Sequence, residues 1–213
     1  MHTIVIVVLN FNYFKNQTAM LGFRRTMSRR TYPTPYTAKI TRMSQRKKKA
    51  YNYLGLGIDP GLAATGFAVI GCLPRGGELC DWGAITTARD TLHEKRLHEI
   101  YCSVHELIVQ WQPDIIAIED VYVMKTYPRA AIQLGEVKGI IALTAAEANV
   151  EYLQIKPTEV KHGLTGNGRA PKHQVCRAVQ SSLGLTHSIK PEHASDAAAI
   201  ALMALSRTGH YNW

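Results

Sequence analysis

Four residues that could hold a divalent cation stand out in the sequence, because each lies where a charge does little for folding. Asp59 ends the apolar stretch YLGLGID, and Glu119 ends the apolar stretch IIAIE. His193 and Asp196 are three residues apart at the start of an alanine-rich segment with helical character. A spacing of three places both side chains on one face of a helix.

The chemistry of these residues follows from where strands end. Carboxyl ends of neighbouring strands in an α/β sheet meet at one edge, and ligands bind there. Carboxylates gathered at a dry edge repel one another and raise one another's pKa. Divalent cations with oxygen ligands, Mg²⁺ or Mn²⁺, remove that repulsion. Two such ions about 4 Å apart can activate a water and stabilise the leaving oxygen of a phosphodiester.

Each of the four residues also has a structural explanation when taken alone. Asp59 could cap the turn that follows it, and Glu119 could pair with a lysine at the surface. Asp196 could complement the helix dipole, and His193 could be a solvated residue of the first turn. The set of four, at the ends of the right elements and in this order, favours the functional interpretation.

The elements that must position these residues form a regular series from residue 53 onward. Period-two patterns and apolar runs predict strands, and apolar residues at helical spacing predict helices. The predicted strands are 53–59, 65–71, 79–87, 114–119 and 151–155, and the predicted helices are 92–111, 129–149, 157–164, 171–185 and 190–206. Short connections between the first three strands imply an antiparallel meander, followed by two α/β units. We expect the strands ending at Asp59 and Glu119 to be neighbours.

The first fifty residues differ in charge from the rest of the chain. They contain eleven of the 25 Lys and Arg residues and none of the 16 acids, so residues 51–213 are close to neutral. We therefore expect a globular domain at 51–213 and a disordered basic extension at 1–50. That extension could be a nucleic-acid-binding arm, an organellar transit peptide, or sequence upstream of the true start. The expected location is cytoplasmic, or an organelle if residues 1–50 are a transit peptide.

Cysteine and apolar patterns exclude two further classes. The four cysteines show no C-x-x-C pairing, which argues against a zinc site and favours a reduced compartment. The longest apolar run near the N-terminus, IVIVVL, is too short to span a bilayer. No interaction with a membrane is expected.

Five stretches in order make the chain resemble the RuvC family of Holliday-junction resolvases. They are GIDPGLAATGFAVI, PDIIAIEDVYV, AIQLGEVKGII, PTEVKHGLTGNGRAPKHQV and HASDAAAIALMAL, and they cover about residues 53–206. The resemblance implies a ribonuclease-H-like α/β fold with a five-stranded mixed sheet, three strands antiparallel and two parallel, flanked by helices. It also implies an Mg²⁺-dependent homodimer that makes two symmetric nicks in a four-way DNA junction, during recombination and repair. Branch-migration proteins of the Ruv type are the expected partners.

Site residues carry over from the family by position. The metal-binding and catalytic acids fall on Asp59, Glu119 and Asp196, with two Mg²⁺ ions per site that Mn²⁺ could replace. His193 takes the fourth catalytic position, as a metal ligand or a proton-transfer group. Tyr122 matches an aromatic residue that stacks on bases near the crossover.

Basic residues for DNA binding concentrate in one window of the sequence. Lys161 and Lys172 match basic positions of the family, and Arg169 lies between them in a glycine-rich loop whose backbone can approach phosphates. In the predicted helix 129–149, Gly135 and Gly139 lie one turn apart, beside Ile132, Ile140 and Leu143. This face is the candidate dimer interface, unless the glycines pack the helix against its own sheet.

Three other functions compete with junction cleavage. A ribonuclease-H-like nuclease acting on RNA or RNA–DNA hybrids would share the acids. A sugar-kinase or actin-like ATPase also opens on a G-I-D-x-G strand, but it needs a second lobe that about 160 residues cannot supply. A DNA-binding module without nuclease activity would not need all four functional side chains.

Overall fold

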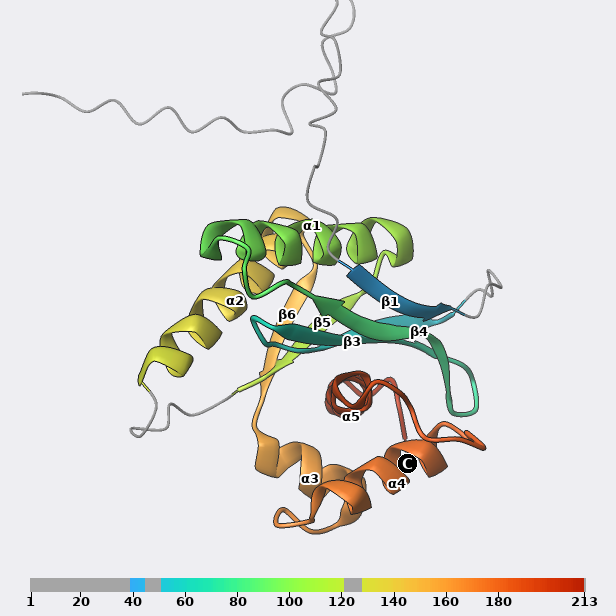
Figure 1. The fold of residues 1–213 in the computed structure, drawn as a ribbon. Helices are drawn as coiled ribbons and strands as arrows, with labels where there is room; N and C mark the ends of the chain where they lie inside the picture. Colours follow the sequence, from blue (N-terminus) through green and yellow to red (C-terminus); the bar gives the residue numbers. More distant parts are fainter. Residues whose placement is uncertain (1–38, 45–50, 121–127, 213) are drawn as a thin grey trace, which may run out of the picture. The chain divides into compact units, whose positions relative to one another are not determined.

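The computed structural model describes residues 39–44, 51–120 and 128–212, which form a six-stranded sheet covered by helices (Figure 1). The strands are β1 (Lys39–Ser44), β2 (Tyr53–Asp59), β3 (Ala64–Cys72), β4 (Gly77–Thr86), β5 (Ile115–Glu119) and β6 (Glu151–Ile155). The helices are α1 (His93–Trp111), α2 (Pro128–Glu147), α3 (Pro157–Thr165), α4 (Lys172–Ser182) and α5 (Glu192–Arg207). Within the described ranges no helix combines the length and the hydropathy needed to cross a bilayer.

The order of strands in the sheet confirms the predicted ribonuclease-H-like topology. The order is β1-β4-β3-β2-β5-β6. The strands β2, β3 and β4 form the expected antiparallel meander, and β5 and β6 continue the sheet in parallel with β2. The strands that end at Asp59 and Glu119 are therefore neighbours, as the sequence predicts.

Strand β1 differs from the sequence-based expectation. The composition predicts residues 39–44 in a disordered extension at 1–50, but they pair antiparallel with β4 from Lys39 opposite Thr86 to Ser44 opposite Asp81. An unpaired β4 would leave a row of backbone donors and acceptors at the sheet edge, and a sixth strand satisfies them. The predicted five strands are thus all present, with one added at the meander edge.

Two layers of helices cover the two faces of the sheet. Helices α1 and α2 lie on one face, and α3, α4 and α5 lie on the other (Figure 1). The apolar run of β5 is buried on both sides, because Ile116 and Ile118 pack toward α1 and α2 while Ile115 and Ala117 pack toward α5. This double burial explains why that strand has a continuous apolar sequence and no polar alternation.

Strand β2 divides its residues between the same two layers. Leu56 and Ile58 belong to the core beneath α1 and α2. Gly57 faces α5, where a Cβ atom would lie 2.1 Å from the carbonyl oxygen of Ala197. Since only a residue without a side chain permits that approach, α5 lies directly on the backbone of the sheet. Asp59 continues the glycine side of the strand, which directs its carboxylate toward α5.

Candidate active site

The acids Asp59 and Glu119 lie at adjacent strand ends on the side of the sheet that α5 covers. The parallel pairing places Gly57 beside Ala117, and each acid follows two residues later on the same face. The side chain of Asp59 is 19% exposed. Strand pairing and a period of two are thus sufficient to bring the two carboxylates to one edge.

The turn after Asp59 does not use its carboxylate. The hydroxyl of Thr65 donates to the carbonyl oxygen of Gly61 at 2.7 Å and accepts from the Gly61 N–H at 3.3 Å. The capping explanation for Asp59 is therefore not needed, because the described hydrogen bonds of this turn come from Thr65 and Thr87. The Asp59 side chain points instead to the first turn of α5.

The first turn of α5 supplies the other two predicted residues. The Nδ1 of His193 lies 2.8 Å from Oδ2 of Asp59, and a carboxylate can only accept in such a bond, so the imidazole donates. One ligand atom each from Asp59, His193 and Asp196 lies within 4.8 Å of the other two. With Nδ1 donating, Nε2 of a neutral His193 keeps a lone pair for a ligand or a proton.

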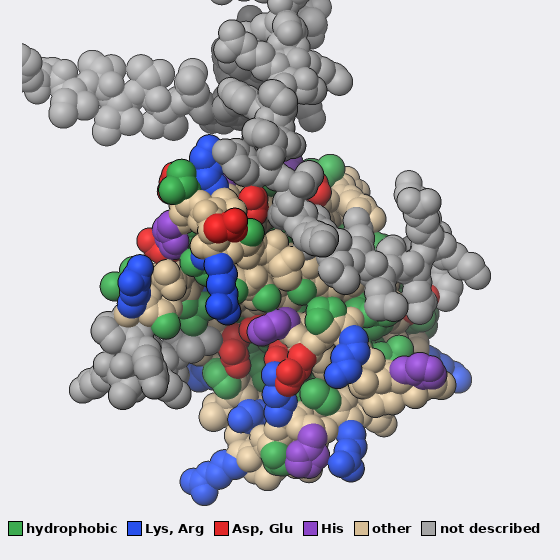
Figure 2. Space-filling model, in the orientation of Figure 1, with side chains coloured by type: hydrophobic (Ala, Val, Ile, Leu, Met, Phe, Trp, Pro, Cys, Tyr) green, Lys and Arg blue, Asp and Glu red, His purple; other side chains and the backbone are tan. Residues whose placement is uncertain are grey.

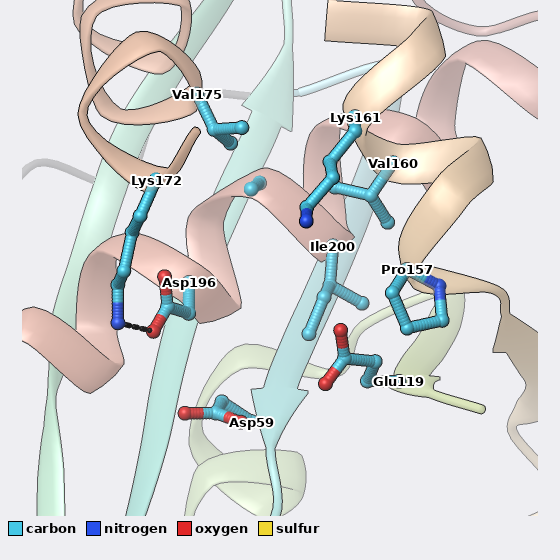
Figure 3. A pocket seen from close by; sticks show the side chains of 10 residues that line it. Asp59, Glu119, Pro157, Val160, Lys161, Lys172, Val175, Asp196 and Ile200 are labelled. Carbon is cyan, nitrogen blue, oxygen red and sulfur yellow. Dashed lines mark ion pairs between the residues drawn. The ribbon is translucent and has the colours of Figure 1, made fainter. Parts of the chain in front are cut away.

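Glu119 lies outside this close group of three but lines the same cavity. That cavity has a volume of about 280 Å³, and its lining includes Asp59, Glu119 and Asp196 together with apolar residues of α3, α4 and α5. The three carboxylates point toward the same space in Figure 3. Among the described residues no Lys or Arg forms an ion pair with Glu119, so the surface-pair explanation does not apply.

Burial and mutual repulsion perturb both strand-end acids. Burial raises the pKa of the Asp59 carboxyl above its usual value; the hydrogen bond from His193 opposes this rise and the charge of Asp196 adds to it. Burial also raises the pKa of Glu119, and the charges of Asp59 and Asp196 raise it further, against smaller effects of Lys161 and Lys138. Like charges held close together in a partly buried cavity lower the stability of the metal-free protein.

Two of the predicted basic residues lie at this cavity. Lys161 of α3 and Lys172 of α4 line it together with the acids (Figure 3). The Nζ of Lys172 lies 2.7 Å from Oδ2 of Asp196 and 2.8 Å from Oε1 of Glu192. Partial burial lowers the pKa of Lys172, but its hydrogen bonds to Asp196 and Glu192 outweigh burial and raise it overall. Lys172 therefore stays charged beside the acids.

The structure does not bring the remaining predicted DNA-binding residues into the cavity. Arg169 is exposed in the loop after α3, where its backbone N–H donates to Oδ1 of Asn167 at 3.0 Å, and it does not line the cavity. Tyr122 lies outside the described residues. On the face shown in Figure 2, acidic side chains and a histidine are exposed together, with Lys and Arg side chains around them.

Two further residues at the site were missed by sequence reasoning. The Nζ of Lys138 on α2 lies 3.5 Å from Oδ1 of Asp120, and the Lys138 charge also lowers the pKa of Glu119. Glu192 shares Lys172 with Asp196. The sequence pattern did not single out Lys138, because it lies in the helix that was predicted to form the dimer interface. Glu192 lies next to His193, so its place in the first turn of the last helix was a usable signal.

The donor set fits divalent cations that prefer oxygen. Carboxylate oxygens and one imidazole nitrogen match Mg²⁺ or Mn²⁺ better than a soft metal. Two half-buried acids with raised pKa values supply the negative charge that a bound cation would neutralise. The arrangement can bind a cation and a water beside a phosphodiester, and the lysines can neutralise the phosphate oxygens.

Comparison with known proteins identifies the same region of the chain. A family profile described as "Crossover junction endodeoxyribonuclease RuvC" matches residues 55–204. A relative of that name from Alkaliphilus oremlandii is 36% identical over 156 residues, which are 73% of this chain and 94% of the relative. Another from Rhodopirellula baltica is 40% identical over 158 residues, which are 73% of this chain and 85% of the relative.

A solved structure agrees with the sequence comparisons. The structure of Thermus thermophilus RuvC in complex with a Holliday junction substrate matches with a TM-score of 0.67 and 27% identity. The match covers 76% of this chain and 99% of that chain. The matched part of this chain therefore corresponds to nearly a whole relative. It includes the helices that cover both faces of the sheet.

Proposed function

Since this chain belongs to the RuvC family of crossover junction endodeoxyribonucleases, we propose that it resolves four-way DNA junctions by paired, symmetric nicks during recombination and repair. The observation that carries the proposal is the meeting of Asp59, Glu119, His193 and Asp196 at one edge of the sheet. Each of these four residues lies within the matched range 55–204. A nuclease of this family needs such a site, whereas a DNA-binding module does not.

Divalent cations are the proposed cofactor, with Mg²⁺ preferred, two ions per site and Mn²⁺ as a substitute. Asp59, Glu119 and Asp196 would hold the ions, because they line one cavity, and His193 lies close enough to Asp59 and Asp196 to serve as a further ligand. When bound, the ions supply charge neutralisation and acidify a water for attack on the phosphodiester. The protein's own part is to hold the acids in place, and the hydrogen bond from His193 favours the ionised form of Asp59.

The remaining residues of the cavity position the strand and move protons. His193 donates through Nδ1 to Asp59, which leaves Nε2 as a metal ligand or an acceptor for the proton of the attacking water. Lys172 would exchange its present carboxylate partners for phosphate oxygens of the junction, and Lys161, which lines the same cavity, would bind phosphate oxygens beside it. Arg169, exposed outside the cavity, would contact more distant phosphates, and Tyr122 would stack on a base at the crossover.

A homodimer would place two such sites in positions related by the two-fold axis of a junction. Helix α2 supports this interface. Gly135 and Gly139 are exposed, and a Cβ on either would meet no atom within 4 Å, so these glycines do not pack α2 against its own sheet. On the same helix, the exposed fraction is 65% for Ile132 and 54% for Leu143. Apolar side chains exposed this far favour a protein partner over solvent.

Proteins of the Ruv type that drive branch migration are the proposed partners in the cell. A cytoplasmic location follows for a bacterial host, and an organellar one if residues 1–50 serve as a transit peptide. Fusion of residues 1–50 to a fluorescent protein tests the second possibility, because a transit peptide would carry the fusion into the organelle.

Substrate choice is the experiment that tests the function. The protein should cut a synthetic four-way junction in Mg²⁺ into two nicked duplexes, with no cutting in EDTA. An RNA–DNA hybrid and a linear duplex of the same sequences should stay intact. Preferential cutting of the hybrid would support a ribonuclease H activity instead.

A further inference from the structure

A second hollow, which we call the arginine groove, lies beside the acid cavity. Its volume is about 650 Å³, and it is lined by the turn at residues 61–64, by Arg89 and Arg96, by the first turns of α2, and by His193. No residue of the described ranges lines both hollows. They meet at the pair Asp59 and His193, since Asp59 lines the cavity and its hydrogen-bonded partner lines the groove.

The charge of the groove is of one sign. Arg89, Arg96 and His193 are the ionisable residues among the described residues that line it, and none of its lining residues is acidic. Glu136 of α2 is hydrogen-bonded to His93 at 2.7 Å and does not line the groove. A concave surface with two guanidinium groups and no carboxylate attracts anions.

One arginine of the groove is held in a fixed position. The Nε of Arg96 donates to Oγ1 of Thr87 at 2.8 Å, and the hydroxyl of Thr87 donates in turn to the carbonyl oxygen of Leu62 at 2.6 Å. Thr87 is buried, so this chain of hydrogen bonds ties the guanidinium to the turn that follows Asp59.

Among the described residues, the remaining donors of both arginines have no partner that would compete with a ligand. In the part of the chain that the structure describes, no carboxylate pairs with Arg89 or Arg96. The Nη groups of Arg96 form no hydrogen bond with any described residue, so within the described ranges the fork that binds phosphate oxygens has no protein partner. Arg89 is exposed and adds a second, more adaptable cation.

We infer that the arginine groove binds the phosphate next to the scissile phosphate on the strand that is cut, with Arg96 as its fixed contact and Arg89 as a second one. This inference rests on the proposed junction cleavage. A DNA strand carries a phosphate at every nucleotide, so a strand whose scissile phosphate lies at the acid cavity must present its next phosphate to one side. His193 marks that side, because it belongs to the groove and touches Asp59.

Arg96 is thus a positioning residue for the reaction. It would fix the register of the strand over the acids through a charge-assisted contact to a phosphate that does not react. A free phosphate or nucleotide could bind the same two guanidinium groups. Removing the charge of one phosphate within the DNA distinguishes a backbone phosphate from these ligands, because only a backbone contact is then lost.

The test combines protein variants with neutral phosphates in the junction. Arg96→Met and Arg89→Met are compared with native protein, and Arg75→Met, in the exposed β3–β4 turn, is the matched control. Each is assayed by single-turnover cleavage on junctions that carry one methylphosphonate on the 5′ or the 3′ side of the cut. Thermal unfolding shows whether each variant is folded.

The expected result is a coupling between protein and DNA changes. Arg96→Met should slow cleavage of the natural junction about tenfold and lower the salt slope of binding by about one. One of the two methylphosphonates should slow the native protein by a similar factor and should have little further effect on Arg96→Met. Arg89→Met should show a smaller loss at the same phosphate, and Arg75→Met should match the native protein.

Two results would overturn the proposal. In the first, both groove variants cut the natural junction as fast as the native protein. In the second, the loss of cleavage rate in each variant multiplies with the loss caused by either methylphosphonate, which is expected for a site that binds free phosphate or for a structural role. If Arg96→Met does not fold, Arg89→Met decides, because that exposed side chain makes no described hydrogen bond. A native protein that cuts no junction overturns the proposed function as well.

Discussion

Gly66 of β3 lies directly beneath His193 of α5, so that a Cβ atom on Gly66 would come within 2.1 Å of the His193 carbonyl oxygen. No real Cβ reaches a backbone oxygen that closely, so any side chain at this position must displace the first turn of α5. That turn carries both His193 and Asp196. The close approach of β3 and α5 therefore sets the distance between the strand-end acids and the helix residues of the site.

Gly66→Ala is expected to impair cleavage by moving this turn. A shift of about 1 Å at a reacting group can slow a reaction about 100-fold, so single-turnover cleavage of a junction should fall by up to that factor. Gly55→Ala is the matched control, since the three atoms nearest to its Cβ, at 3.0–3.2 Å, all belong to the side chain of Leu205 and none to the backbone of α5. Equal cleavage rates for the two variants would show that the β3–α5 contact does not position the site.

Glu119→Gln is expected to stabilise the protein when metal is removed. The pKa of Glu119 is raised in the folded protein, so folding favours the neutral carboxyl. The resulting stability is fully present below 4.5, the ordinary pKa of the unfolded chain, and is lost as the pH rises through the pKa of the folded protein. The amide of the variant does not ionise and keeps this stability at neutral pH. In EDTA the melting temperature of the variant should exceed that of native protein by about 2–4 °C at pH 7.

The pH dependence supplies the check on that prediction. At pH 4 both side chains are largely uncharged, so the difference in melting temperature should nearly vanish. Adding Mg²⁺ at pH 7 should raise the melting temperature of native protein more than that of Glu119→Gln. A difference that is the same at pH 4 and pH 7 would show that the ionisation of Glu119 does not cause it.

The sequence predicts which strands are neighbours, but it does not predict how closely a helix packs on them. Asp59 and Glu119 were predictable as neighbours, because a meander followed by an α/β unit places their strands side by side. The contact between Gly66 and His193 was not, because it depends on how closely α5 approaches the sheet, and spacing along the chain does not encode that distance. The glycines that the sequence did single out, in α2, face open space.

Other differences have similar physical causes. Strand β1 was missed because the basic composition of residues 1–50 hides a segment whose pairing is set by the open edge of β4. Lys161 and Lys172 were predicted as DNA contacts and lie at the cavity, but the ion pairs of Lys172 with Asp196 and Glu192 required the packing of α4 against α5. The fold follows from patterns within elements, and the site details follow from contacts between them.

Lys172→Ala is expected to weaken junction binding and to flatten its dependence on salt. Loss of one phosphate contact should lower the slope of log affinity against log salt by about one. Lys172→Arg keeps the charge and should retain most of the slope. Fluorescence anisotropy in Ca²⁺, over a series of salt concentrations, measures the slope for all three proteins. An unchanged slope for Lys172→Ala would mean that its charge serves only Asp196 and Glu192.

Introducing charge on α2 is expected to separate the subunits of the proposed dimer. Ile132 and Leu143 are eleven residues apart and share one helix face with Gly139, so Ile132→Glu combined with Leu143→Glu should give a monomer. Val109→Glu is the matched control, because Val109 of α1 has a similar exposed fraction of 62%. Sedimentation velocity at micromolar concentration distinguishes the states. A native protein that is monomeric both alone and with a junction contradicts the interface.

The most direct test of the acid site compares Asp59→Asn with native protein on one four-way junction. The amide keeps the shape of the side chain and removes the charge that a divalent cation requires. Binding is measured by gel shift in Ca²⁺, and cleavage by single-turnover assay in Mg²⁺. We predict that Asp59→Asn binds the junction with native affinity and does not cut it. Cleavage by Asp59→Asn at a rate near that of native protein would contradict the account.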